Sequence, residues 1–430
     1  MSSIETTLVV RSFHDSPSPT TVLKQAMQDK QICNLQLLSI IFRQCTADAL
    51  VELLQDGRNW KTVKLIRCKL NRVDDARAMM MALQYVEHVE FSWTWHVHDL
   101  KYALATTKEE SRLQTLVLRE THLADDTSLE EGLSRTRSLK KLEIHQVLLH
   151  PFVESLSRGL QQNVYLERLD ISCCKLPDEN LAELVRAAFE NNPYLTTLNI
   201  AGNECGPLGL LALGTILQCA DSNLETLNLS RQELSSTADS TDETEEQGFH
   251  NIGVFAEALA VNSTLVRCDL SRNGLTNDDA AVLGRALAQN RTLYELNLSF
   301  NKIGDEGMQQ FSSYVPSMSV RRLSIKPNPF GNAGAQYILD AIKDNMHIEF
   351  LDSLFGLDLH CARQLRLYAH LNRGGRRILQ SESVVLGLWP LILDRATTIP
   401  YYSDRDAHVR ATVLFYLLQN GADKFMVQQR

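Results

Sequence analysis

The 430-residue sequence has no apolar run long enough to cross a membrane as a helix. Its longest apolar stretch, from Val384 to Leu393, is about half of the roughly 20 residues that a spanning helix needs. The first fifteen residues, MSSIETTLVVRSFHD, lack a basic segment before their apolar stretch, so they do not match a secretory signal. We therefore expect a cytoplasmic protein, with a nuclear location as the alternative, and no membrane partner.

Positive charge is also scarce, because 43 Lys and Arg residues stand against 52 Asp and Glu residues, which gives a net charge of −9. Nucleic acids usually bind proteins with an excess of Lys and Arg, so we expect no nucleic-acid partner. The nine cysteines form no CxxC pair. Their odd number and spacing favour reduced thiols over a disulfide framework.

Motifs for catalysis, phosphate binding and metal binding are missing as well. The segment AGNECGPLG at 201–209 has glycines but lacks the Lys-Ser/Thr pair of a phosphate-binding loop. His96 and His98 have no second pair of ligands at zinc-site spacing. We expect no catalytic residues, no cofactor, no metal and no small-molecule substrate.

What the sequence does contain is a repeat with the template LxxLxLxxNxL. The template is clearest in LETLNLSRQEL (224–234), LVRCDLSRNGL (265–275) and LYELNLSFNKI (293–303). Its eleven copies begin at Ile32, Trp60, Val86, Leu113, Leu139, Leu166, Leu195, Leu224, Leu265, Leu293 and Val320. Successive starts lie 26 to 29 residues apart, except for one step of 41. Helical patterns such as 275–290 lie between the copies, so each repeat is predicted to be a strand, a turn and a helix.

This pattern resembles the ribonuclease-inhibitor type of leucine-rich repeat over residues 32–347. The resemblance implies an α/β solenoid shaped as a horseshoe, with a parallel sheet on its concave side and helices on its convex side. We expect an N-terminal cap at 1–31 with a helix at 20–30, and a solenoid of about 11–12 repeats at 32–359. A C-terminal helical cap or docking segment is expected at 360–430, with helices at 360–371, 384–396 and 404–420.

Two segments outside the template carry alternatives. NRGGRRIL (372–379) and LWPLILDRA (388–396) resemble the tail of some algal and protist leucine-rich-repeat proteins, and the tail is either a cap or a docking module. The acidic insertion at 235–248, SSTADSTDETEEQG, is predicted to be a disordered loop and is alternatively a phosphorylation site.

The ninth template position differs between the two halves of the array. Asn203, Asn273, Asn301 and Asn328 occupy it in later repeats, where their amides can satisfy backbone groups at the strand ends. The earlier repeats place other side chains there: Ile40, Cys68, Thr94, Thr121, Val147 and Cys174. We expect the earlier half to be less regular.

Candidate binding residues follow from the template positions that point away from the core. Acidic and amide side chains at position five suit a partner with a basic centre, although they are alternatively part of the repeat consensus. Exposed aromatic residues favour an interface, although Trp93 is alternatively covered by a loop. The predicted protein-binding residues of the concave face are Lys64, His88, Glu90, Trp93, Glu143, Asp170, Asn199, Asn228, Asp269, Tyr294, Asn297 and Phe300.

The sequence thus predicts a non-enzymatic scaffold that presents its concave face to a protein partner of unknown identity. One alternative is a GTPase-activating protein of the Ran type, which shares the repeat and would use a surface polar or Arg side chain. The sequence lacks the long acidic C-terminal tract of that family. Another alternative is a substrate-recruiting or sensor subunit that docks through its C-terminal helices.

Overall fold

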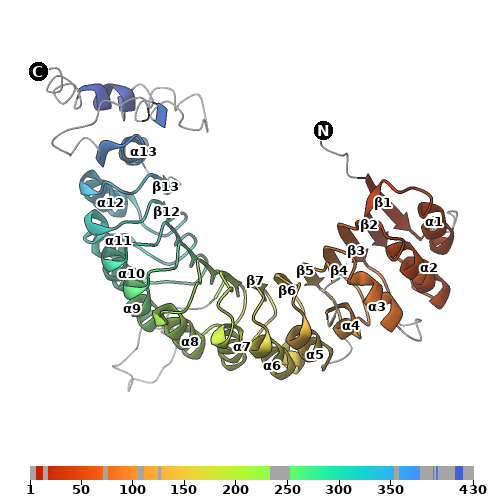
Figure 1. Cartoon of the computed structure of the whole chain (residues 1–430). Helices are drawn as coiled ribbons and strands as arrows, with labels where there is room; N and C mark the ends of the chain where they lie inside the picture. The colour runs from red at the N-terminus through yellow and green to blue at the C-terminus, as the bar shows by residue number, and fades with distance from the viewer. Residues whose placement is uncertain are drawn as a thin grey trace, which may run out of the picture. The chain divides into compact units, whose positions relative to one another are not determined.

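The computed structural model describes residues 6–12, 18–70, 76–104, 111–123, 127–232, 252–352, 358–377, 391, 394–395 and 412–419. It contains two compact units, the first formed by residues 1–216 with 220–224 and the second by 217–219 with 225–430. Strands and helices alternate along each unit (Figure 1).

The first unit contains strands β1 to β8 and the helices that follow them. The strands are β1 Thr6–Arg11, β2 Ile32–Leu38, β3 Thr62–Ile66, β4 His88–Ser92, β5 Thr115–Arg119, β6 Lys141–His145, β7 Arg168–Asp170 and β8 Thr197–Asn199. The helices are α1 Pro19–Ala26, α2 Gln44–Leu54, α3 Arg77–Leu83, α4 Leu100–Leu104, α5 Thr127–Arg135, η1 His150–Phe152, α6 Val153–Gln162, α7 Asp178–Glu190 and α8 Pro207–Gln218.

The second unit contains strands β9 to β13. They are β9 Thr226–Asn228, β10 Arg267–Asp269, β11 Glu295–Asn297, β12 Arg322–Ser324 and β13 Phe350–Asp352. The helices are α9 Gly253–Val261, α10 Asn277–Gln289, α11 Asp305–Ser312, η2 Val315–Ser317, α12 Asn332–Asp344 and α13 Leu359–Arg373.

The sheet of each unit is parallel, and its strands follow one another in sequence order. Helices cover one face of each sheet and, among the described residues, leave the other face without helices (Figure 1). From β3 to β12, every strand begins at the third position of its template copy. The predicted α/β solenoid of leucine-rich repeats is therefore confirmed.

The core lies between the sheet and the helices and is filled by the leucines of the template. In β5 and β6, positions four and six are Leu116, Leu118, Leu142 and Ile144, and all four side chains are fully buried. Burial of such a side chain stabilises a fold by about 1.5–3 kcal/mol. Because each repeat is covered by its neighbours, this stabilisation depends on the stack rather than on any single repeat.

The asparagine ladder at position nine is present as predicted. The amide of Asn301 donates to the Leu270 and Leu298 carbonyls at 3.1 and 2.9 Å, and its oxygen accepts from the Asn273 and Leu275 amides at 2.8 and 3.2 Å. In the first unit the Thr94 hydroxyl donates at the equivalent place, to the Leu65 carbonyl at 2.9 Å. A hydroxyl or thiol thus replaces part of the ladder where asparagine is missing.

Strands β7 to β11 each end at an Asp or Asn at template position five, whereas the equally short β12 has Ser324 there. The side-chain oxygens of Asp170, Asn199, Asn228, Asp269 and Asn297 each accept a hydrogen bond from the backbone N–H two residues later, at 2.8–3.1 Å. This local bond competes with the ladder of the sheet, and each of these three-residue strands ends at that residue. Strands β3 to β6, which lack Asp or Asn there, have five residues.

Strands β2 to β6 of the earlier half are longer than the strands of the later half, and the expectation that this half would be less regular stays a prediction. The longer strands β2 to β6 pair without a register shift, and the one shift recorded among the described pairs lies between Thr6 and Thr7 in β1. The additional two residues of each strand extend the ladder where no Asp or Asn interrupts it.

Each end of the array carries a buried arginine. Arg58 donates to the carbonyls of Ala26, Met27 and Asp29 at the C-terminal end of α1. These carbonyls have no partner inside the helix, so the guanidinium satisfies them.

Arg376 does the same at the other end. It donates to the carbonyls of Lys343 and Asn345, which close α12. Burial lowers the pKa of Arg376. This residue belongs to the NRGGRRIL segment, so that part of the tail packs against the last repeats.

Several predicted segments lie wholly or partly outside the described residues. The predicted cap helix at 20–30 corresponds to α1, and β1 adds a strand that the template does not predict. The helix predicted at 360–371 is α13. The acidic insertion at 235–248 lies outside, as does most of 384–396, and of 404–420 only residues 412–419, which are helical, are described. The boundaries between caps and solenoid stay predictions.

Candidate functional site

The loops that follow the strands share a left-handed residue at template position eight. Ten consecutive repeats place a positive φ there, between 47° and 68°, at Ser39, Arg67, Trp93, Glu120, Gln146, Cys173, Gly202, Arg231, Arg272 and Phe300. Only Gly202 among these is glycine, although non-glycine residues rarely adopt this conformation. The turn is therefore imposed by the repeat. It projects the side chain at position eight from the edge of the sheet where the strands end, which we call the post-strand edge.

In the first unit this edge forms a groove of about 750 Å³, which we call the tryptophan groove. Its most exposed apolar side chains are Trp93, Trp95 and Leu148, with 49, 55 and 66% of their surface accessible. Trp95 stacks on His122 with ring centroids 6.2 Å apart. The backbone is fixed beneath them, because the Trp93 amide donates to the Arg119 carbonyl at 2.9 Å and the Trp95 amide to the Cys68 carbonyl at 3.0 Å.

Beside the groove, the helix-free face of the first unit carries a row of ion pairs across its strands. Lys64 Nζ lies 2.7 Å from Glu90 Oε2, and His88 Nε2 lies 4.0 Å from the same oxygen. Arg119 Nε lies 4.0 Å from Glu90 Oε1, and Arg119 Nη2 lies 3.6 Å from Glu143 Oε2. The guanidinium thus links two strands past Val117, which occupies position five of β5 and is 2% exposed.

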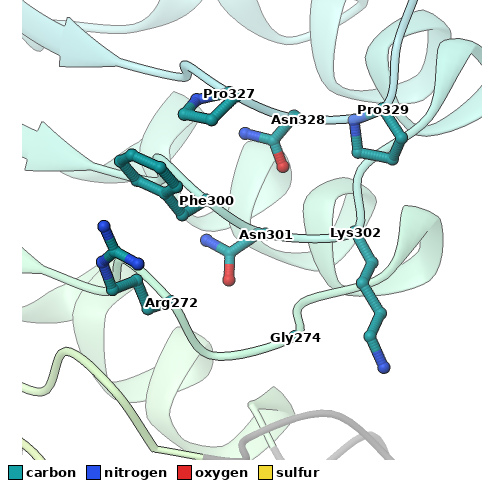
Figure 2. Close-up of a pocket in the computed structure, with 8 residues that line it drawn as sticks. All are labelled: Arg272, Gly274, Phe300, Asn301, Lys302, Pro327, Asn328 and Pro329. Carbon is teal, nitrogen blue, oxygen red and sulfur yellow. The ribbon is translucent and has the colours of Figure 1, made fainter.

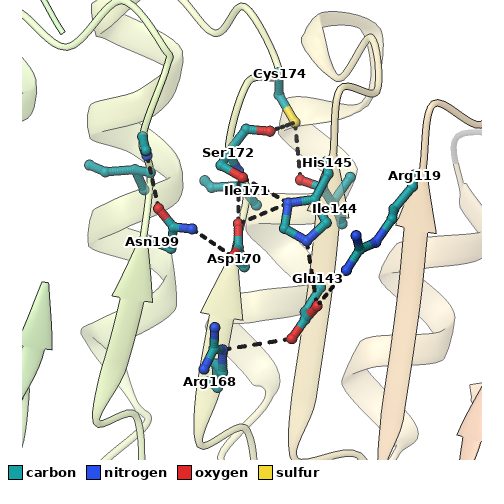
Figure 3. Close-up of polar contacts among 12 residues, drawn as sticks. Arg119, Glu143, Ile144, His145, Arg168, Asp170, Ile171, Ser172, Cys174 and Asn199 are labelled. Carbon is teal, nitrogen blue, oxygen red and sulfur yellow. Dashed lines mark hydrogen bonds and ion pairs between the residues drawn. The ribbon is translucent and has the colours of Figure 1, made fainter. Parts of the chain in front are cut away.

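The row continues over β6, β7 and β8 (Figure 3). His145 lies between two carboxylates, with Nε2 at 3.4 Å from Glu143 and Nδ1 at 3.3 Å from Asp170. Arg168 approaches Glu143 at 3.7 Å, and the Asn199 amide donates to Asp170 at 2.6 Å. We call the set Lys64, Glu90, Arg119, Glu143, His145, Arg168, Asp170 and Asn199 the ion-pair row.

The ion-pair row holds its carboxylates ionised. The hydrogen bond with His88 and the contacts with Lys64 hold the pKa of Glu90 far below its usual range. The pKa of Glu143 is lowered mainly by its hydrogen bond with His145 and then by the charges of Arg168 and Arg119. Each carboxylate already has a cationic neighbour, so the row presents alternating charges rather than one acidic surface.

The predicted binding residues of the first unit therefore fall into two connected groups. Lys64, His88, Glu90, Glu143, Asp170 and Asn199 belong to the ion-pair row or adjoin it, and Trp93 lines the groove. The sequence did not single out the bridging Arg119 and Arg168, nor His122 and Leu148. The first two stand at template positions seven and three, and their partners lie on neighbouring strands, which a single repeat does not reveal.

In the second unit Asn228, Asp269 and Asn297 are register partners on adjacent strands, and the Asn297 amide donates to Asp269 at 3.0 Å. Asn228, Asp269 and Asn297 end their strands as described above. Phe300 is 45% exposed, and the guanidinium carbon of Arg272 lies 3.9 Å from its ring centroid. Arg321 lies 6.0 Å from the ring centroid of Tyr294.

The described part of the chain has neither a metal-binding cluster nor a membrane-spanning helix. No group of three or more His, Cys, Asp or Glu residues there is placed to hold a metal ion. None of its helices combines the length and apolarity needed to span a membrane. Burial raises the pKa of Cys68 to about 11 and of Cys174 to about 12, so these thiols are protonated at neutral pH.

Comparison with known proteins gives a consistent result. A family model described as "Leucine Rich repeat" matches residues 191–214 and 289–312. The chain is 30% identical over 190 residues to human NACHT, LRR and PYD domains-containing protein 5. This match covers 39% of the present chain and 16% of the human protein. It is 28% identical over 194 residues to mouse Centrosomal protein of 78 kDa, a match that covers 43% of this chain and 24% of the mouse protein. It is 29% identical over 199 residues to bovine Tonsoku-like protein, a match that covers 45% of this chain and 13% of the bovine protein.

The matched regions are thus a minor part of each relative, at most 24% of its length among these three. The two family-model matches, 191–214 and 289–312, lie within the repeat array. The shared template, the stacked strand–helix repeats and these matches show that the chain is a leucine-rich-repeat protein.

Proposed function

We propose that this protein is a non-enzymatic scaffold that binds a protein partner at the tryptophan groove, with the ion-pair row as the adjoining surface. The observation that carries the proposal is the exposure of Trp93, Trp95 and Leu148 in one groove. Contiguous exposed apolar surface is rare on monomeric proteins unless it binds something. Tryptophan is also among the residues that contribute most to protein interfaces.

The groove suits a partner side chain that is large and apolar. Its floor is held by backbone hydrogen bonds between repeats, so little ordering is needed when a partner binds. The ion-pair row offers paired charges beside it, which favour a partner with polar groups of both signs.

The finer assignments are proposals of the same kind. The 26–29-residue spacing with a helix in most repeats supports the ribonuclease-inhibitor subtype. The free cysteines support a reducing, cytoplasmic location. The Ran-type and recruiting-subunit alternatives stay predictions, because no contact among the described residues favours either one.

The test replaces Trp93 and Leu148 by asparagine and compares affinity capture from source lysate with the intact chain. Asparagine tolerates the left-handed backbone at position 93, so the variant removes apolar surface without a new conformational cost. Tyr194→Asn is the matched control, since Tyr194 is 60% exposed in the same unit but does not line the groove. Unchanged thermal melting of both variants establishes equal folding.

A partner retained by the intact chain and the control, and lost by the double variant, is the expected result. Retention of every captured protein by the double variant would place binding elsewhere and overturn the proposal.

A further inference from the structure

The post-strand edge of the second unit carries positive charge. Its loops at 229–232, 270–276, 298–304 and 325–331 contain Arg231, Arg272, Lys302 and Lys326 but no Asp or Glu. This is a locally basic edge on a chain whose net charge is −9. Lys326 pairs with Asp352 at 2.9 Å, whereas Arg231, Arg272 and Lys302 form no ion pair with any residue that the structure describes.

Two carboxylates close to this edge in sequence, Asp269 and Asp305, already have hydrogen-bond donors. Asp269 accepts hydrogen bonds from the Ser271 amide at 2.8 Å and from the Asn297 side chain at 3.0 Å. Asp305 accepts from the backbone amides of Gly331 and Gly334, both at 2.7 Å. The unpaired cations of the edge are therefore available to an anionic group from outside.

The basic edge also contains a pocket of about 600 Å³ (Figure 2). Phe300, Pro327 and Pro329 give it apolar walls, and Arg272 and Lys302 stand at its margin (Figure 2). The Arg272 guanidinium stacks on the Phe300 ring, with 3.9 Å between the guanidinium carbon and the ring centroid. A stacked guanidinium keeps its N–H groups free at its edge, where they can form two parallel hydrogen bonds with a carboxylate.

The pocket has a fixed shape because structural contacts hold its base. Asn301 and Asn328 belong to the asparagine ladder and donate to backbone carbonyls at 2.6–3.1 Å. Arg272 and Phe300 both occupy position eight, with φ of 61° and 60°, so the repeat turn projects them side by side. An apolar cavity bordered by unpaired cations fits a ligand that has one apolar side chain among negative charges.

We propose that this pocket, bordered by Arg272, Phe300 and Lys302, binds an acidic peptide segment of a partner protein through one apolar side chain flanked by carboxylates. Phe300, Pro327 and Pro329 take the apolar side chain, and Arg272 and Lys302 take the carboxylates. The site lies in the second unit and does not depend on the tryptophan groove.

The probe is a fluorescein-labelled peptide with glutamate and aspartate on both sides of a central phenylalanine, titrated with the full-length chain and followed by fluorescence anisotropy. The matched peptide carries glutamine and asparagine instead. The acidic peptide is expected to bind and to weaken as salt is raised, because exposed charges are screened. The neutral peptide is expected to bind at least about tenfold more weakly.

Three variants separate this site from general charge attraction. Arg272→Gln combined with Lys302→Gln is expected to weaken the acidic peptide about tenfold or more. Phe300→Asn, which keeps the left-handed turn, is expected to weaken it by removing the apolar wall. Arg285→Gln removes one positive charge from an exposed position on α10 and is expected to leave binding unchanged.

The segment at 235–248 carries five acidic residues of its own, so the titration is repeated with these changed to asparagine and glutamine. Binding by either protein, lost in the Arg272 and Lys302 variant, supports the proposal. Absence of binding in both proteins, an equal loss in Arg285→Gln, or a preference for a single-stranded oligonucleotide of equal charge would overturn it.

Discussion

Glu143 shows how a single side chain connects neighbouring repeats on the helix-free face. It approaches Arg119 on β5, His145 on its own strand and Arg168 on β7, at distances of 3.4–3.7 Å. Its folded-state pKa is lowered, so the folded protein binds a proton at this carboxyl less readily than the unfolded chain does. Its stabilising contribution is therefore complete above the unfolded pKa of about 4.3 and is lost as pH falls through the lower, folded value.

Glu143→Gln tests this linkage at the residue scale. We expect the variant to lose about 1–2 kcal/mol in free energy of unfolding at pH 7, because a neutral amide cannot form ion pairs with Arg119 and Arg168. The loss should be smaller at pH 3, where the wild-type carboxyl approaches protonation. Urea unfolding at both pH values, beside the exposed Glu183→Gln on α7, measures it. An equal loss at pH 7 and pH 3 would contradict the linkage.

Among the elements, the strands show how far the sequence alone could go. The template predicted where strands begin, because leucine spacing reports the side of the sheet that is buried. It did not predict where they end, because the ends of β7 to β11 coincide with a local hydrogen bond from the side chain at position five. Strand β5, which has Val117 at position five, contains five residues, whereas β11, which has Asn297 there, contains three.

Asn297→Val tests this cause of strand length. The substitution removes the acceptor for the Ser299 amide at 3.1 Å and the donor to Asp269 at 3.0 Å. We expect a loss of about 1–2 kcal/mol in free energy of unfolding and faster hydrogen exchange at the Ser299 amide. Gln309→Leu, at an exposed position on α11, is the control. Unchanged exchange at Ser299 would show that the side-chain bond does not hold the turn.

A second set of asparagines at the helix ends was visible in the sequence but not recognised. Asn163 donates to the Leu133 carbonyl at 2.9 Å and accepts from the Leu166 amide at 3.0 Å. Asn290 and Asn345 make equivalent contacts three residues before their own template copies. The signal in the sequence was an asparagine three residues before the first apolar residue of the template. Its role could not be predicted, because the carbonyl that it contacts belongs to the preceding repeat.

For the whole molecule, a buried arginine near each end of the array satisfies the last carbonyls of a helix, in two different sequence contexts. Arg58 and Arg376 each place a guanidinium against the last carbonyls of a terminal helix. The template predicted that caps were needed, because a terminal repeat has a neighbour on one side only. It could not predict the arginines, since both lie outside the repeat pattern.

Replacing each arginine by methionine separates the two ends. We expect Arg376→Met to cost about 2–3 kcal/mol, because several carbonyls lose a charged donor. Hydrogen exchange followed by mass spectrometry should show the loss of protection in α12 and α13, while α1 and α2 keep theirs. Arg58→Met should give the reverse pattern. Loss of protection throughout the chain from either variant would show that the repeats unfold as one unit.

The candidate surfaces were only partly within reach of the sequence. Trp93 and Phe300 were predicted because position eight points away from the core, and both are exposed. The tryptophan groove itself was not predicted, because Trp95 and Leu148 lie beyond that position on loops whose path depends on neighbouring repeats. The basic edge was likewise not predicted, because the negative net charge of the whole chain gives no indication of local positive charge.

The left-handed turn at position eight has a consequence for how such a protein changes over time. Because the repeat imposes that backbone on serine, arginine, tryptophan, glutamate and phenylalanine alike, the residue type there is almost independent of the fold. One substitution at this position therefore alters one point of the surface, at a known place, and leaves the stack intact. New binding preferences can arise one repeat at a time, without rebuilding the core.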